Sequence, residues 1–139
     1  MAREKHFDVI VIGGGQSGLA VGYYLRRTGL SYVILDDQEK AGGAWLQTWD
    51  SLKLFSPAEH SSLPGWVMPK DTEEYPRKDH VIQYLKDYEV RYKLPIERPV
   101  SVMGVQKHQQ LFTLETSRGE YSSKAAGQCN RHMEKSLYS

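Results

Sequence analysis

Three glycines, Gly13, Gly15 and Gly18, stand directly after an apolar run and constrain the fold more than any other feature of the chain. The run, residues 9–12, has no polar alternation, which predicts a strand buried on both faces of a parallel sheet. In a G-x-G-x-x-G turn the first glycine lets the chain turn sharply and the second lets the backbone approach a pyrophosphate. The third lets the next helix pack close to the strand. The pattern therefore predicts a strand, a phosphate-binding turn and a helix.

A helix and a second strand are expected directly after this turn. The helix would begin near Gln16 and Ser17, with its N–H groups and positive dipole end toward the phosphates, and would stop before Gly29. A second apolar run, residues 32–35, ends at Asp36, about 20 residues past the glycines, where a carboxylate can accept hydrogen bonds from a ribose hydroxyl. These parts occur in the order of a dinucleotide-binding unit. A nucleotide-free βαβ unit with coincidental glycines is the alternative.

Composition sets broad limits on partners and location. With 18 basic and 17 acidic residues the net charge is +1, which gives no reason to expect a nucleic acid or a membrane surface as partner. The first apolar run is too short, and too soon interrupted by glycine, for a signal peptide or a membrane span. Cys129 is the single cysteine, so we expect no intramolecular disulfide and a cytoplasmic location. Cys129 and His132 alone do not make a metal site, and we expect none.

A second glycine pair, Gly42 and Gly43, is followed by Trp45. Adjacent glycines let the backbone come close to a large flat or charged ligand, and an indole supplies apolar surface beside it. An ordinary glycine loop with core tryptophans is the alternative. With the first glycine turn, Asp36 and residues 49–54, the pattern resembles the FAD domain of flavin-dependent monooxygenases, the flavin-containing and Baeyer–Villiger relatives. The segments most similar to the bacterial branch associated with arsenic-resistance operons are residues 55–57, 61–66, 75–76 and 84–85.

The resemblance covers about residues 7–120 and implies an α/β fold: a Rossmann-like FAD-binding domain with an incomplete parallel sheet and a small antiparallel β-meander. It implies an oxidoreductase in which NADPH reduces FAD and one oxygen atom of O2 enters a small organic substrate. The residues expected near the FAD are Gly13, Gly15, Gln16, Ser17, Gly18, Asp36, Gly42, Gly43, Trp45, Leu54 and Ser56. The family usually has glutamate at the position of Asp36, and aspartate is shorter but keeps the acceptor.

Three further segments follow. Residues 56–76 are rich in proline, glycine and serine and form a loop, either a wall of the active-site entrance or a surface crossover with buried anchors. The periodicity of residues 77–93 predicts an amphipathic helix, with Asp79 capping or charging its first turn. A β-meander is expected at about residues 99–124, with a hairpin turn at residues 117–120.

The C-terminal residues break the resemblance. Beyond about Tyr121 the family has a buried strand that closes with Ala-Thr-Gly, whereas residues 126–135 are polar and aperiodic. The codons of residues 127–134, read one base later, permit Val-Ser-Ala-Thr-Gly-Thr and then force Trp, so we hypothesise a one-base frameshift near residues 119–126. A native divergent tail is the alternative. We therefore divide the chain into an FAD-binding portion, 1–126, and an out-of-frame or disordered tail, 127–139.

Two consequences of this hypothesis can be stated. Without the family's strand, the run at residues 9–12 would have an unpaired apolar flank that invites self-association. The family's second glycine fingerprint, for NADPH, and its substrate half are absent from this sequence, so we expect a truncated chain, inactive alone, in which no catalytic residue can be named. Two other functions stay open: a non-catalytic dinucleotide-binding or interaction module, and an NAD-binding dehydrogenase fragment, against which Gly42, Gly43 and Trp45 argue.

Overall fold

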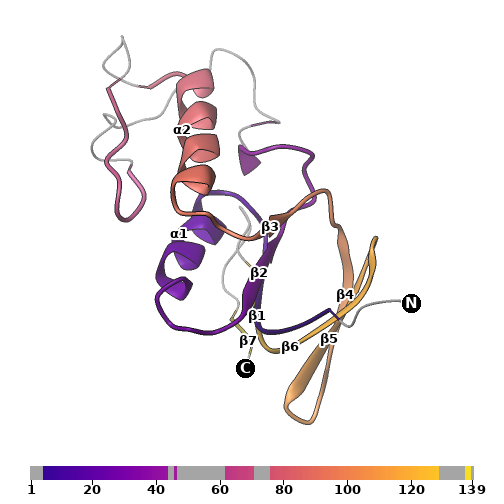
Figure 1. The fold of residues 1–139 in the computed structure, drawn as a ribbon. Coiled ribbons are helices and arrows are strands. Elements are labelled where there is room, and N and C mark those ends of the chain that lie inside the picture. The colour runs from indigo at the N-terminus through magenta and orange to yellow at the C-terminus, as the bar shows by residue number, and fades with distance from the viewer. Residues whose placement is uncertain (1–4, 44–45, 47–61, 71–75, 129–136, 139) are drawn as a thin grey trace.

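The computed structural model describes residues 5–43, 46, 62–70, 76–128 and 137–138 of the chain (Figure 1). In chain order its elements are β1 (Lys5–Ile12), α1 (Gln16–Leu25), β2 (Tyr32–Leu35), α2 (Lys78–Arg91), β3 (Ile96–Glu97), β4 (Val102–His108), β5 (Leu111–Thr116), β6 (Gly119–Gln128) and β7 (Leu137–Tyr138). The predicted strand, helix and second strand at the N-terminus are therefore confirmed.

Within the described residues the strands form one seven-stranded sheet, with the order β3-β2-β1-β6-β5-β4 and with β7 pairing with β6. Strands β3, β2, β1 and β6 are parallel to their neighbours, while β6, β5 and β4 form an antiparallel meander. The long strand β6 belongs to both parts. The predicted α/β fold, a parallel sheet with a small meander, is confirmed.

The sheet is covered on two faces, as an uninterrupted apolar strand requires. Figure 1 shows both helices on one side of β1 and β2, with the β4–β5 hairpin on the other side. Val11 and Ile34 pack with Leu19 of α1 and Leu85 of α2 in one core cluster. The second cluster lies on the opposite face and comprises Ile10, Val33, Leu35, Val100, Phe112, Leu114, Tyr121 and Ala126. Neighbouring residues of β1 thus point into different cores because side chains alternate along a strand.

The expectation that β1 has an unpaired flank is wrong. Strand β6 pairs with β1 in parallel from Lys5↔Tyr121 to Ile12↔Gln128. Pairing in a sheet uses backbone N–H and C=O groups, so the polar side chains of this segment do not prevent it, and the small residues Ala125, Ala126 and Gly127 fit beside β1. The ends of the sheet path are β3 and β4. The self-association inferred from an exposed edge at β1 thereby loses its structural premise.

The amphipathic helix predicted at residues 77–93 is α2, Lys78–Arg91. Arg77 is its N-cap residue and forms no side-chain cap hydrogen bond, so Asp79 lies in the first turn and supplies negative charge near the positive dipole end. Lys86, Asp87 and Arg91 are exposed, whereas Val81, Tyr84, Leu85 and Tyr88 are buried.

Tyrosine hydroxyls of α2 hold the described part of the preceding loop, residues 62–70. The Tyr84 hydroxyl donates to the Trp66 carbonyl oxygen at 2.5 Å and accepts a hydrogen bond from the Leu63 N–H at 2.9 Å. The Tyr88 hydroxyl donates to the Pro64 carbonyl oxygen at 2.5 Å. Of the expected anchors Leu63, Trp66, Val67 and Met68, Met68 is buried and Val67 is 63% exposed, so the prediction of a crossover with buried anchors holds in part. The alternative, a wall of the active-site entrance, concerns residues that extend outside the described ranges and stays a prediction.

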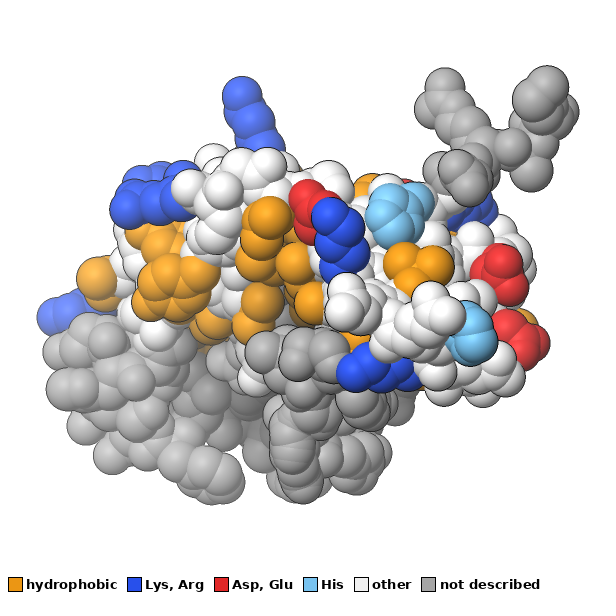
Figure 2. All heavy atoms as spheres, turned by 90° about the horizontal axis from the view of Figure 1, so that it is seen from below, with side chains coloured by type: hydrophobic (Ala, Val, Ile, Leu, Met, Phe, Trp, Pro, Cys, Tyr) orange, Lys and Arg blue, Asp and Glu red, His pale blue; other side chains and the backbone are white. Residues whose placement is uncertain are grey.

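Charged side chains of both signs share the face seen in Figure 2, where apolar side chains gather in the middle. This mixture agrees with the net charge of +1. Within the described residues, neither α1 nor α2 is long and apolar enough to cross a membrane.

Candidate functional site

The first glycine turn joins the end of β1 to the start of α1. Gly13 has φ 111°, a conformation that glycine adopts at no steric cost, and its N–H donates to the Leu35 carbonyl oxygen of β2 at 2.7 Å. A Cβ atom at Gly18 would lie 1.9 Å from the Gly13 carbonyl oxygen and 3.7 Å from Val11 Cγ1. The third glycine therefore lets the helix approach both the turn and the strand, as the sequence predicts.

The second glycine pair meets the first glycine turn in space. A Cβ atom at Gly43 would lie 2.7 Å from Gly15 Cα, and one at Gly15 would lie 3.8 Å from Gly43 Cα. Two segments far apart in the sequence thus present backbone to one another with no side chain between them. Such a surface is the kind that a pyrophosphate can approach closely.

The N-terminus of α1 opens onto the same place. Gly15 is the N-cap residue of the helix and forms no side-chain cap hydrogen bond. The Leu19 N–H donates to the Gly15 carbonyl oxygen at 3.0 Å, so the N–H groups of Gln16, Ser17 and Gly18 precede the first bond of the helix. Together with the helix dipole, these N–H groups favour an anion.

Asp36 lies beside the glycine turn, at the end of β2. It is 2% exposed, and a Cβ atom at Gly14 would lie 2.7 Å from its carboxylate carbon. The middle glycine of the turn, to which the sequence pattern assigns no role, therefore leaves room for the predicted ribose-binding carboxylate.

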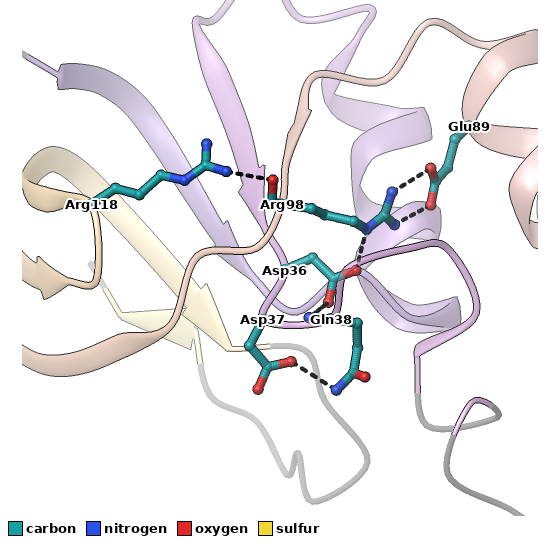
Figure 3. A network of polar contacts seen from close by, with 6 residues as sticks. All are labelled: Asp36, Asp37, Gln38, Glu89, Arg98 and Arg118. Carbon is teal, nitrogen blue, oxygen red and sulfur yellow. Dashed lines mark hydrogen bonds and ion pairs between the residues drawn. The ribbon is translucent and has the colours of Figure 1, made fainter.

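Arg98 links this carboxylate to α2 (Figure 3). Its Nε donates to Asp36 Oδ2 at 2.5 Å, while its two terminal nitrogens donate to the two carboxylate oxygens of Glu89. Asp36 Oδ1 also accepts a hydrogen bond from the Gln38 N–H at 3.2 Å. Burial lowers the pKa of Arg98, but the hydrogen bonds with Glu89 and Asp36 outweigh burial and raise it overall, so the guanidinium stays charged.

The structure brings together most of the residues predicted to lie near the FAD. Gly13, Gly15, Gln16, Ser17, Gly18 and Asp36 surround the end of β1 and the start of α1, and Gly43 touches Gly15. Gly42 is buried against Leu46 and Ile82, for a Cβ atom there would lie 2.9 Å from Leu46 Cδ2 and 3.4 Å from Ile82 Cγ1. Trp45, Leu54 and Ser56 lie outside the described residues. Their roles, and ligand contact by the others, stay predictions.

Three residues of the site were missed by reasoning from the sequence: Gly14, Glu89 and Arg98. Gly14 could have been found, because the turn holds three consecutive glycines and a side chain at the middle one would point toward the next strand. Glu89 and Arg98 carry no local signal, since they reach Asp36 only through the tertiary fold. Among the described residues there is no group of three or more histidines, cysteines or acids that could hold a metal ion.

Comparison with known proteins identifies the family of the chain. The family model described as pyridine nucleotide-disulphide oxidoreductase matches residues 10–126. An uncharacterized oxidoreductase, CzcO-like, from Geobacillus kaustophilus is 40% identical over 82% of this chain and 33% of its own length. The uncharacterized oxidoreductase CzcO of Bacillus velezensis is 41% identical over 85% of this chain and 34% of its own. The chain thus spans about a third of the length of these curated relatives.

Solved structures show the same fold. The flavin-containing monooxygenase from Stenotrophomonas maltophilia matches with a TM-score of 0.87 and 47% identity, over 90% of this chain and 38% of that one. Cyclohexanone monooxygenase matches with a TM-score of 0.81 and 20% identity, over 90% of this chain and 27% of that one, which shows the fold alone.

Proposed function

The chain belongs to the pyridine nucleotide-disulphide oxidoreductase family, within which it groups with the flavin monooxygenases. From this premise we propose that it is the FAD-binding part of an NAD(P)H-dependent flavoprotein monooxygenase. The observation that carries the proposal is the contact between Gly15 and Gly43, which leaves bare backbone at the N-terminus of α1. The close approach of Gly43 to Gly15 leaves no side chain between the two glycine segments, and the N–H groups at the start of α1 suit a pyrophosphate.

Each described residue has one task in this proposal. The N–H groups of Gln16, Ser17 and Gly18 bind the pyrophosphate, and Asp36 accepts hydrogen bonds from the adenosine ribose. Gly43 lies where it would border the same pyrophosphate. The bound FAD supplies the redox chemistry, while the chain binds and orients it.

The remaining steps of a monooxygenase concern whole proteins of the family. We propose that NADPH reduces the FAD and that a small organic molecule receives one oxygen atom. The sequence holds no second glycine fingerprint for NADPH, so we expect these 139 residues to bind FAD without completing the cycle. A cytoplasmic location is proposed from the single cysteine.

A titration with FAD tests this function. The purified chain should quench the fluorescence of added FAD in a saturable manner, and NADH should compete only weakly. Addition of NADPH should cause no oxidation of NADPH above that with free FAD. A folded sample that binds NADH in preference to FAD would favour a dehydrogenase fragment instead, and one that binds neither would favour an interaction module.

The frameshift is kept as a proposal for the C-terminal segment. Gly127 and Gln128 lie in β6, so the ordered strand extends past the boundary expected at residue 126. The DNA downstream of codon 110 provides the test. A neighbouring frame that continues with Ala-Thr-Gly-x-Trp and a second glycine fingerprint would support a truncated monooxygenase gene. If no neighbouring reading frame continues with that motif, the tail is native.

A further inference from the structure

Asp36 is fixed by the segment at residues 97–100 through three separate contacts. Its N–H donates to the Glu97 carbonyl oxygen at 3.1 Å, and its own carbonyl oxygen accepts from the Val100 N–H at 2.8 Å. Its carboxylate accepts from Arg98 Nε at 2.5 Å. Glu97 and Val100 therefore set where the Asp36 backbone lies, and Arg98 sets where its carboxylate points.

The orientation of Arg98 is fixed in turn. Both terminal nitrogens are paired with Glu89 of α2, and a planar guanidinium bound at three nitrogens cannot rotate without losing hydrogen bonds. The exposed fractions of the side chains are 15% for Arg98, 3% for Asp36 and 12% for Glu89, so water screens these ion pairs little. Figure 3 shows the guanidinium lying between the two carboxylates.

We propose that Arg98 is a positioning residue that aims the Asp36 carboxylate at the adenosine ribose, with Glu89 as its anchor. The proposal rests on the proposed function of the chain as an FAD-binding domain. A carboxylate offers about four lone-pair sites, and Arg98 and the Gln38 N–H use two of them, which leaves acceptors for the ribose hydroxyls. Because Glu89 and Asp36 already engage Arg98, the site favours a ribose without a 2′-phosphate.

The test compares two ligands on the full chain. One is FAD, and the other is an FAD analogue whose adenosine lacks the 2′ and 3′ hydroxyls. A hydrogen bond to a charged group changes affinity by about 10- to 100-fold, so the wild type should bind FAD tighter than the analogue by at least about tenfold. Arg98→Gln should bring the ratio of the two dissociation constants close to one, mainly by weakening FAD. A merely structural role would weaken both ligands equally and leave the ratio unchanged.

Two further variants make the result decisive. Arg91→Gln removes an arginine of α2, the helix that carries Glu89; its guanidinium lies over the Trp66 ring, 4.9 Å from its centroid, and the variant should leave the ratio at the wild-type value. If Arg98→Gln does not fold, Arg98→Lys keeps a cation but cannot pair with both Asp36 and Glu89 as a fork, and it should lower the ratio at least threefold.

The outcomes separate the two claims. Wild type that binds neither ligand contradicts the proposed function. Wild type that binds both ligands equally, or an Arg98 variant with the wild-type ratio, leaves FAD binding intact and overturns the role of Arg98.

Discussion

Substitution of Gly43 by alanine tests the contact on which the candidate site depends. The added Cβ would lie 2.7 Å from Gly15 Cα, whereas two carbon atoms in contact prefer about 3.5–4.0 Å, so the two glycine segments must move apart by about 1 Å. The φ angle of 53° adds about 1 kcal/mol of backbone strain for alanine. The separation should cost one hydrogen bond to the pyrophosphate, about 1.5–3 kcal/mol, which weakens FAD binding by about 10- to 100-fold.

Gly29→Ala is the matched control. Gly29 also has a positive φ angle, 79°, but a Cβ atom there would have nothing within 4 Å. Both variants should lose stability in urea unfolding from backbone strain, Gly43→Ala more because of its clash with Gly15, and only Gly43→Ala should lose affinity for FAD in a fluorescence titration. Equal dissociation constants for Gly43→Ala and Gly29→Ala would refute the assignment of the Gly15–Gly43 contact to the pyrophosphate.

Three further predictions concern stability. The Asp8 carboxylate accepts a hydrogen bond from the Ser31 backbone N–H, which lowers the pKa of Asp8. The contribution of Asp8 to the stability of the fold is therefore present above the unfolded pKa and is lost as pH falls through the folded pKa. An NMR titration of Asp8 should show a midpoint below the normal aspartate range, and a normal midpoint would contradict this. Leu85→Ala should lower the free energy of unfolding, measured by urea melts, by about 2–5 kcal/mol because Leu85 is fully buried. Its control is Val90→Ala on the same helix: Val90 is 73% exposed, so this change should alter the free energy of unfolding by less than about 0.5 kcal/mol. Tyr84→Phe leaves two loop groups without their partner and should cost about 1–3 kcal/mol, so a thermal melt that matches the wild type would contradict the anchoring of residues 62–70.

The elements up to the end of α2 could be predicted from local sequence. An apolar run, a glycine turn and an amphipathic helix are each encoded by neighbouring residues, and β1, α1, β2 and α2 lie within a few residues of the predicted ranges. Strand β6 could not be predicted in full, because its second half, residues 124–128, has no large apolar or β-branched residue and its position next to β1 is decided by backbone pairing across more than a hundred residues of sequence.

In the candidate site, too, some residues could be predicted from local sequence and others are determined by tertiary packing. The glycines and Asp36 are recognisable from their spacing, which the chemistry of a dinucleotide requires. The contact between Gly15 and Gly43, and the link from Asp36 through Arg98 to Glu89, depend on where β3 and α2 pack. Spacing along the chain carries no information about such contacts, so only the structure could reveal Arg98.

Backbone NMR of the chain with and without FAD tests the central claim most directly, and at 15.9 kDa the chain is well suited to it. The account predicts that FAD shifts the amide signals of Gly13, Gly15, Gly18 and Gly43, while those of Gly104 and Gly119 in the meander stay in place. Signals of Gly15 and Gly43 that do not move at saturating FAD, or shifts confined to the meander, would contradict it.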